Sequence, residues 1–367
     1  MTKLKAFLKK EPILVIAALA ALASCLFVPP DGAYLGYIDF RTLALLYALM
    51  VVSVGLRKAG TFEALAHLLC RRTSGARALS FTLVALTFFS SMLITNDVAL
   101  LTFVPFAVVL LGLTGRGQDL ILVVVLQTAA ANLGSMLTPV GNPQNLYLYS
   151  YYGLSALDFF CITAPVWALS LLLCLLGCLA LPGVKLSVPF GEAPKPDKRL
   201  LWLYLWLFVL CLLSVFRLLP WPVLLGVLVL ALLVLDRKTL LAADFLLLAT
   251  FVAFFVFAGN LARLEAVKAL AQKLLAGREY WTALLVSQVI SNVPAALLLS
   301  GFTEEARELL LGVDVGGLGT PIASLASLIS LKLYSHSDHA HTGRYLLEFT
   351  GINLILLALL SLAQALL

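Results

Sequence analysis

The sequence predicts an all-α integral membrane protein. Of its 367 residues, 62% are hydrophobic and only 12% are charged. That charged share is about half of what globular domains carry, and no soluble domain can bury so much apolar surface. The 25 basic residues are scattered between apolar stretches instead of forming one patch, so the formal charge of +6 does not indicate a nucleic-acid partner.

Eleven apolar stretches run along the chain, and a helix needs about 20 residues to cross the hydrocarbon core. The first follows a lysine-rich start and is interpreted as a retained helix rather than a cleaved signal peptide. Two stretches are too long for one crossing and short for two, which predicts about nine full crossings and two re-entrant hairpins. The stretches lie near residues 12–29, 37–56, 78–112 (first hairpin), 119–149, 158–181, 199–218, 221–236, 240–258, 280–311 (second hairpin), 313–334 and 344–366.

Each predicted hairpin has a polar interruption at its middle. The first contains Thr95-Asn96-Asp97 and the second contains Ser291-Asn292-Val293-Pro294. Both sequences also suit ordinary solvent turns between short crossings, which is the alternative interpretation. Glycine and proline clusters in 119–149 and 313–334 predict two broken transmembrane helices, because an uninterrupted helix tolerates such clusters poorly.

An internal repeat relates these interruptions. Residues Gly134–Asn142 align without gaps with Gly316–Ser324, and Gly, Thr and Pro coincide. Upstream, Thr95-Asn96 corresponds to Ser291-Asn292. The order in each half is therefore an amphipathic segment, a split hairpin and a broken helix.

A single crossing near 199–218 separates the two halves, so the second half should enter the membrane upside down relative to the first. Inverted repeats with discontinuous helices near the bilayer midplane are typical of secondary transporters. The predicted division is a first inverted repeat at 1–182, a cytoplasmic linker and connecting helix at 183–220, and a second inverted repeat at 221–367.

Basic residues predict the orientation in a plasma (cytoplasmic) membrane. With the amino terminus in the cytoplasm, 18 of the 25 Lys and Arg residues lie inside and 7 outside, which satisfies the positive-inside rule and places the carboxyl terminus outside. Segments 60–74 and 261–277 each follow a glycine and mix charges with Leu and Ala. We expect both to be amphipathic helices at the membrane surface.

The predicted hairpins direct helix amino termini, beginning near Val98 and Pro294, toward the membrane centre. Unpaired amides give such an end about half a positive charge, and two converging ends suit an anion. Hydroxyl and amide side chains at the interruptions can complete the site. The predicted substrate-binding residues are Thr95, Asn96, Ser291, Asn292, Thr138 and Thr320.

Ion coupling has two candidate sources. Unwound backbone carbonyls at Gly134–Thr138 and Gly316–Thr320 could replace the hydration shell of sodium. Asp97 is the acidic residue at a predicted tip, where a charge is costly and usually functional, although a turn or helix-cap role is the alternative. The predicted ion-coupling residues are Asp97, Asn96, Gly134, Asn142, Asn292, Gly316, Gly317 and Ser324.

No cofactor other than a coupling sodium ion or proton is expected. The histidine-rich tract at 336–341 is interpreted as a solvated loop rather than a metal site. The absence of a Gly-x-x-x-x-Gly-Lys-Ser/Thr loop argues against a primary pump, and no histidine lies at a predicted membrane centre, which argues against an enzyme.

Three segments carry a resemblance to the ion transporter superfamily. They are Thr95–Leu101, Ser291–Ala296 and Gly312–Leu328. Their Asn-Asp tip, Asn-x-Pro tip and Thr-Pro segment are most similar to the branch of arsenite permeases and citrate-transporter-like carriers. The similarity extends from about residue 40 to 335.

The resemblance implies a homodimer in which scaffold helices make the dimer contact and a transport domain moves across the membrane. In related dicarboxylate carriers, both tips read Ser-Asn-Thr and bind sodium and the substrate carboxylate. Here the tips differ at the third position, Asp97 and Val293, and the acidic residue favours proton coupling.

The expected function is therefore secondary active transport of a small anion, citrate- or dicarboxylate-like or an inorganic oxyanion, driven by sodium or protons. The alternatives are an arsenite or antimonite efflux permease, a sodium/proton antiporter of the same fold, and a passive channel.

Overall fold

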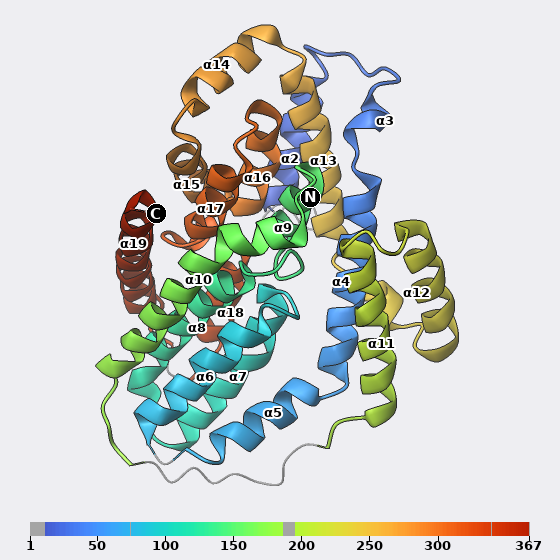
Figure 1. Cartoon of the computed structure of the whole chain (residues 1–367). Helices are drawn as coiled ribbons and strands as arrows, with labels where there is room; N and C mark the ends of the chain where they lie inside the picture. Colours follow the sequence, from blue (N-terminus) through green and yellow to red (C-terminus); the bar gives the residue numbers. More distant parts are fainter. Residues whose placement is uncertain (1–11, 74, 186–194, 339, 367) are drawn as a thin grey trace, which may run out of the picture.

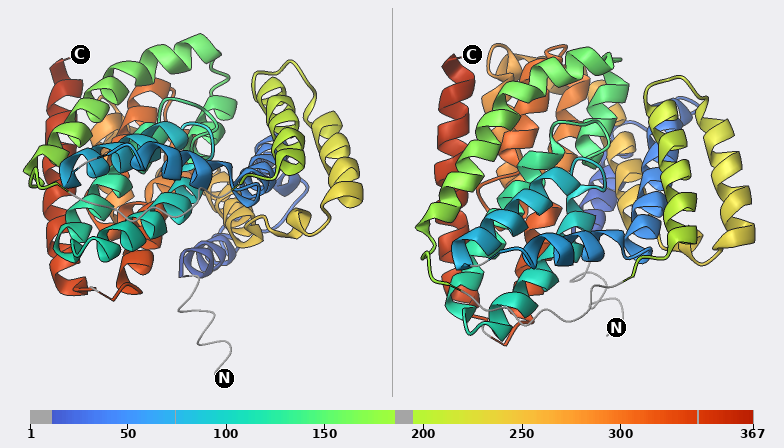
Figure 2. Two further views of the ribbon diagram at one scale, coloured as in Figure 1. Left: turned by 90° about the horizontal axis from the view of Figure 1, so that it is seen from below. Right: turned by 60° about the horizontal axis from the view of Figure 1, so that its bottom comes forward.

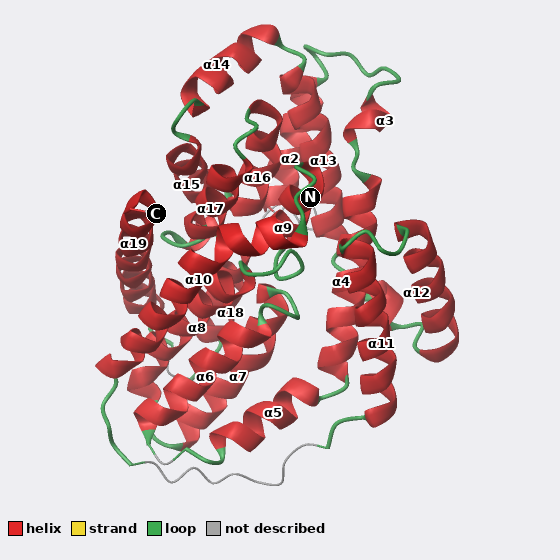
Figure 3. Ribbon diagram, in the orientation of Figure 1, coloured by secondary structure: helices red, strands yellow, loops and turns green. Residues whose placement is uncertain are grey.

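The computed structural model describes residues 12–73, 75–185, 195–338 and 340–366. The lysine-rich start, the middle of the predicted linker and His339 of the histidine-rich tract lie outside the described residues. The described residues form helices and connecting loops without any β-strand (Figure 3). Within them, seven helical segments are long and apolar enough to cross a membrane: Phe40–Lys58, Asn96–Leu113, Gly117–Ser135, Ala156–Ala180, Lys198–Val215, Phe245–Ala262 and Thr342–Leu366.

These spans confirm a helical membrane protein, while the count of nine crossings stays a prediction. The first apolar stretch forms a helix of 13 residues, α2 (Pro12–Ser24), and residues 221–236 form one of 15, α12 (Trp221–Leu235). Both are shorter than the usual span.

The first half runs from α2 to α10 (Figure 1). The first hairpin consists of α6 and α7, and the first broken helix consists of α8 and α9 on either side of a loop. The elements are α2, α3 (Tyr34–Tyr37), α4 (Phe40–Lys58), α5 (Thr61–Cys70), α6 (Ala76–Ser90), α7 (Asn96–Leu113), η1 (Gly117–Asp119), α8 (Leu120–Ser135), α9 (Pro143–Tyr151), α10 (Ala156–Gly177) and η2 (Cys178–Ala180).

The second half repeats this order. The second hairpin consists of α15 and α16, and the second broken helix consists of α17 and α18. The elements are α11 (Lys198–Val215), α12, η3 (Thr239–Leu241), α13 (Phe245–Ala262), α14 (Glu265–Leu275), α15 (Glu279–Ile290), α16 (Asn292–Leu299), η4 (Ser300–Phe302), α17 (Ala306–Gly316), η5 (Pro321–Ala323), α18 (Leu325–Ser335) and α19 (Thr342–Leu366).

The predicted boundary between hairpin and broken helix at 311–313 is wrong. The second hairpin ends at Phe302, and α17 begins seven residues before the predicted start. A polar turn causes the break, because extended Thr303 accepts a hydrogen bond from the Glu305 amide through its Oγ1 at 3.1 Å. Two glutamates at the turn favour solvent over a hairpin interior.

The two halves interlock. Helix α7 of the first hairpin packs on α18, and α16 of the second hairpin packs on α9. Within each half, α6 packs on α8 and α15 packs on α17. The short helix α5 lies at the lower end of the molecule with the start of α6, whereas α14 lies at the upper end with the start of α15 (Figure 1).

A second group of helices stands to one side. Helices α11 and α12 pack on α4 and on each other, and both views of Figure 2 show them apart from the hairpins. Their outward side chains are apolar and exposed, including Trp202, Trp206 and Val234. Such faces are covered by lipid or by another membrane-embedded chain.

Glycines permit the tight helix pairs. A Cβ atom at Gly134 would lie 2.2 Å from the Phe88 carbonyl oxygen on α6, and one at Gly316 would lie 3.0 Å from Leu284 Cα on α15. Any larger residue would push these helices apart. The two hairpins are therefore seated on the broken helices at equivalent positions.

Replacing Gly134 by alanine should destabilise the fold by about 1–3 kcal/mol, because the added methyl group has no room. The matched control is Gly226→Ala, since Gly226 also lies inside a helix but has open space within 4 Å of the place that the added methyl group would take. The control should be neutral or stabilising by up to about 1 kcal/mol. Unfolding of the purified variants in detergent measures both, and equal behaviour would contradict the close packing.

Candidate functional site

The two hairpin tips have the same local structure. Thr95 and Ser291 have positive φ angles of 40° and 77°, and only one other described non-glycine residue shares this feature. In both tips the following asparagine accepts a hydrogen bond from the next backbone amide at 2.9 Å, Asp97 to Asn96 and Val293 to Asn292. Such backbone strain costs about 1–3 kcal/mol per residue and is concentrated at functional sites.

Both tips are buried in the protein. The exposed fractions are 6% for Asn96, 2% for Ser291 and 4% for Asn292. The alternative of two solvent turns is therefore wrong. Helices α7 and α16 begin at the asparagines, two residues earlier than the predicted starts at Val98 and Pro294.

The second pieces of the broken helices are capped alike. Asn142 Oδ1 accepts from the Asn145 amide at 3.1 Å, and Ser324 Oγ accepts from the Ser327 amide at 3.1 Å. Both capping residues have extended backbones, and Pro143 starts α9 at the position where proline is best tolerated. Helices α9 and α18 are thereby fixed with their amino termini toward the interior.

The two threonines of the repeat tie each loop to its own hairpin. Thr138 Oγ1 donates to the Met92 carbonyl at 2.6 Å, and Thr320 Oγ1 donates to the Gln288 carbonyl at 3.3 Å. Met92 and Gln288 each lie three residues before the strained tip residue. The hydrogen bonds therefore follow the alignment of the two halves.

One cavity of about 40 Å³ is lined by the first residues of four helices. Asn96 and Asp97 begin α7, Pro143 and Gln144 begin α9, Asn292 to Pro294 begin α16, and Leu325 begins α18. Ile13 of α2 and Leu247 and Thr250 of α13 close the other side. Asp97 is the one ionisable residue among the described lining residues, and the helix ends supply the positive partial charges there.

The structure brings together some of the sequence-predicted site residues but not all. Those that line the cavity are Asn96, Asp97, Ser291, Asn292 and Ser324. The predicted residues that do not line it are Thr95, Thr138, Thr320, Gly134, Asn142, Gly316 and Gly317.

Asp97 is half-buried at the cavity, and its Oδ1 has no hydrogen-bond partner. The first residue of α7 is preceded by Thr95, whose side chain makes no capping hydrogen bond. Asp244, the residue that caps α13, is the charged group that interacts electrostatically with the Asp97 carboxylate. The Asp97 carboxylate is thus available to an ion or proton in the cavity.

Sequence reasoning missed Asn132 of α8. Its Oδ1 accepts from Asn96 Nδ2 at 3.1 Å and from Ser324 Oγ at 3.2 Å, and its Nδ2 donates to the Gly317 carbonyl at 3.5 Å. Asn132 therefore joins the first tip to the second broken helix. A lone asparagine two residues before Gly134 in an apolar helix was the available signal.

Side-chain amides also satisfy the unwound carbonyls. Gln288 Nε2 donates to the carbonyls of Gly316 at 2.7 Å and Leu318 at 2.9 Å. In the first half, Trp167 Nε1 donates to the Gly134 carbonyl at 3.2 Å and Asn145 Nδ2 donates to the Met136 carbonyl at 3.2 Å. Four of the carbonyls predicted as sodium ligands, those of Gly134, Met136, Gly316 and Leu318, thus accept hydrogen bonds from side chains.

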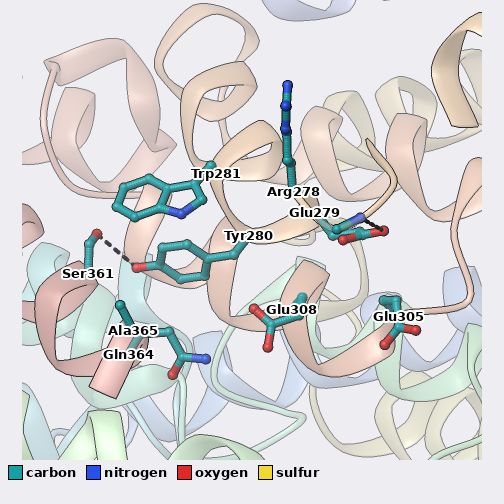
Figure 4. A pocket seen from close by; sticks show the side chains of 10 residues that line it. Arg278, Glu279, Tyr280, Trp281, Glu305, Glu308, Ser361, Gln364 and Ala365 are labelled. Atoms are coloured by element: carbon teal, nitrogen blue, oxygen red, sulfur yellow. Dashed lines mark hydrogen bonds between the residues drawn. The ribbon is translucent and has the colours of Figure 1, made fainter. Parts of the chain in front are cut away.

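A larger open cavity of about 340 Å³ lies elsewhere, between the start of α15 and the end of α19 (Figure 4). Its polar lining includes Glu279, Glu305 and Glu308 beside Arg278, and Tyr280 hydrogen-bonds Ser361 at 2.9 Å. It contains none of the sequence-predicted site residues.

Comparison with known proteins agrees with this architecture. Residues 6–329 match the family model described as "Citrate transporter". The chain is 33% identical over 302 residues to the inner membrane protein YbiR of Escherichia coli, covering 81% of this chain and 80% of that one. It is 32% identical over 320 residues to the uncharacterized transporter MJ0456 of Methanocaldococcus jannaschii, covering 84% and 85%. The silicon efflux transporter LSI3 of rice, Oryza sativa, is 34% identical over 145 residues, covering 39% and 29%.

The contact between Asn96 and Asn132 should appear as a coupling energy. The double variant Asn96→Ala/Asn132→Ala should lose less free energy of unfolding than the two single variants together. The difference should be about 0.6 to 1.7 kcal/mol, which are the average and the largest values for polar contacts between membrane helices. Asn353 is the control, because it is fully buried but donates to Phe349 within its own helix. Asn96→Ala and Asn353→Ala should be additive in equilibrium unfolding; coupling of the control pair instead would refute the assignment.

Proposed function

Because this chain belongs to the citrate transporter family, we propose that it is a secondary active transporter of a small anion, driven by a sodium or proton gradient. Its relatives are transporters rather than enzymes, and the helices make it a multi-pass membrane protein. The anion is citrate- or dicarboxylate-like or an inorganic oxyanion.

The observation that carries this proposal is the convergence of four helix amino termini on one cavity. Each end carries part of a positive charge, even though one backbone amide at each is hydrogen-bonded to the side chain of its tip or capping residue. Asn96, Ser291 and Asn292 add polar groups at the same place. A small anion is the ligand for which such a site is suited.

The cavity supports a moving transport domain. Its volume of about 40 Å³ holds one or two water molecules, much less than a citrate-sized anion needs. One wall belongs to α2 and α13, whereas the opposite wall is made by the hairpin tips and broken helices. We propose that elevator-type movement of the tips relative to α13 opens the site alternately to each side.

The proposed architecture has two inverted repeats, 1–182 and 221–367, joined by a linker and connecting helix at 183–220. The matching tips and caps, and the opposite placement of α5 and α14, support inversion. We propose a homodimer through the exposed apolar faces of α11 and α12. The proposed location is a cytoplasmic membrane, since a relative is named an inner membrane protein. The proposed orientation places the amino terminus in the cytoplasm and the carboxyl terminus outside.

A second candidate is efflux of an oxyanion or metalloid such as arsenite or antimonite. The name of the rice relative, a silicon efflux transporter, favours this direction over part of the chain. Growth in arsenite with and without expression separates efflux from uptake, since efflux raises tolerance.

A thermal-shift screen of the purified protein tests the function. Citrate, succinate, sulfate, phosphate and arsenite are each added with and without sodium. A ligand at 100 times its Kd stabilises the folded protein by about 2.7 kcal/mol through mass action. One of these anions should raise Tm, and no shift with any of them would contradict the proposal.

Asn96→Ala and Asn292→Ala should each abolish uptake of that anion into liposomes with little loss of folded protein, because each removes polar groups from a cavity rather than apolar packing. Asn353→Ala is the matched control, since it removes a buried amide that does not line the cavity. Wild-type rates in both tip variants would show that the site is elsewhere.

Asp97→Asn should still exchange substrate without a gradient but lose gradient-driven accumulation, because it removes the charge that a proton or sodium ion can cancel. Asp158→Asn, at the exposed cap of α10, should keep both activities. The measurement compares uptake under an imposed pH or sodium gradient with zero-gradient exchange. Full gradient-driven accumulation by Asp97→Asn would show that Asp97 has a structural role and does not couple transport to the ion gradient.

A further inference from the structure

Asp314 is a carboxyl group buried deep between the two broken helices. It lies on α17, two residues before the helix ends, and its exposed fraction is 2%. Gln144 Nε2 donates to its Oδ1 at 3.3 Å. The polar side chains of Asn142 and Asn145 also interact with the carboxyl group. Its Oδ2 has no hydrogen-bond partner. Leaving an ionised oxygen buried in this way is costly.

No charged group among the described residues compensates Asp314. The groups that act on its carboxyl are the three amide side chains, and none of the ion pairs in the described part of the chain includes it. Helices α8 and α16, which pack on α17, carry no titratable side chain. The other packed helices and α17 itself carry titratable side chains, but none of these interacts electrostatically with Asp314. They are Tyr147, Tyr149 and Tyr151 of α9, Asp158, Cys161 and Cys174 of α10, Glu279 and Tyr280 of α15, Arg307 and Glu308 of α17, and Arg344, Tyr345 and Glu348 of α19.

The internal repeat identifies what Asp314 replaces. The alignment of Gly134 with Gly316 makes Asn132 the equivalent of Asp314 in the first half. Asn132 accepts two hydrogen bonds at Oδ1 and donates one from Nδ2 to a backbone carbonyl. Asp314 likewise accepts at Oδ1, but its Oδ2 can act as the donor only when it carries a proton. A protonated Asp314 thus has the shape and hydrogen-bonding capacity of the asparagine.

The surroundings favour a proton over a metal cation. The nearby carbonyls of Met136, Gly316 and Leu318 already accept hydrogen bonds from side-chain amides. Asn145 Oδ1 has no donor, although it is fully buried beside Asp314. A proton adds the missing donor without requiring the full set of oxygen ligands that a metal cation takes.

We propose that Asp314 is a protonation site that must be occupied for the two broken helices to close around the substrate cavity. This inference rests on the proposed transport function and adds a positioning residue to it. The Oδ2 atom takes a proton from water when α9 and α17 separate and returns it to water when they separate again. No other bond forms or breaks, so one proton is gained and lost per site.

Reciprocal exchange of the two equivalent residues tests the proposal. Zero-gradient exchange of the anion that raises Tm is measured across a pH range of about 5 to 9 in liposomes. The rate of Asp314→Asn relative to wild type should rise with pH, by up to about tenfold per pH unit, because only the wild type loses its proton. Asn132→Asp should show the opposite trend. Its exchange rate relative to wild type should fall as pH rises. Glu308→Gln, at a half-buried position of α17 outside the lining of the substrate cavity, should leave the wild-type profile unchanged.

The outcomes are separable. A constant ratio of Asp314→Asn to wild-type rates at every pH would overturn the inference while leaving transport intact. Absence of any exchange by the wild type would instead refute the proposed function. If either variant is inactive, Tm against pH decides, since the stability of Asp314→Asn relative to wild type should increase with pH only if Asp314 holds a proton in the folded protein.

Discussion

The structure depends on satisfying backbone amides and carbonyls where helices stop in the buried interior of a membrane protein. Water cannot do so in the hydrocarbon core, and an unpaired group there costs several kcal/mol. Here the side chains of neighbouring helices take this role. Gln288 holds two carbonyls of the second broken helix, while Thr138 and Thr320 clamp the hairpin backbones. Because the amides and carbonyls are fixed, the helix ends can all point at one cavity.

The same constraint explains why both halves share their hydrogen bonds although few residues are identical. Asn142 and Ser324 differ, yet both cap a helix with a side-chain oxygen. Where the halves do differ, at Asn132 and Asp314, we propose that the difference carries function. Asn132 is neutral in one half, while Asp314 can gain or lose a proton in the other. In this proposal, two otherwise similar halves differ in one titratable side chain.

Sequence reasoning located the interruptions because polar and glycine-rich segments stand out in apolar helices. The tip asparagines and the Thr-Pro loops were predicted at their observed places, whereas the helix starts at Val98 and Pro294 were predicted two residues late. The Thr303–Glu305 turn was missed because apolar stretches on both sides concealed it. Gln288 and Asn132 were missed because a single amide in a long helix does not reveal its partner, which lies far away in sequence and is set by the tertiary fold.

The central claim is that the two tips form one anion site. A cryo-electron microscopy structure with the anion that raises Tm tests this claim most directly. The account predicts density between Asn96 and Asn292, in contact with the starts of α7 and α16, and a wider separation of these tips from Thr250 on α13. Density only in the open cavity beside Arg278 would contradict it.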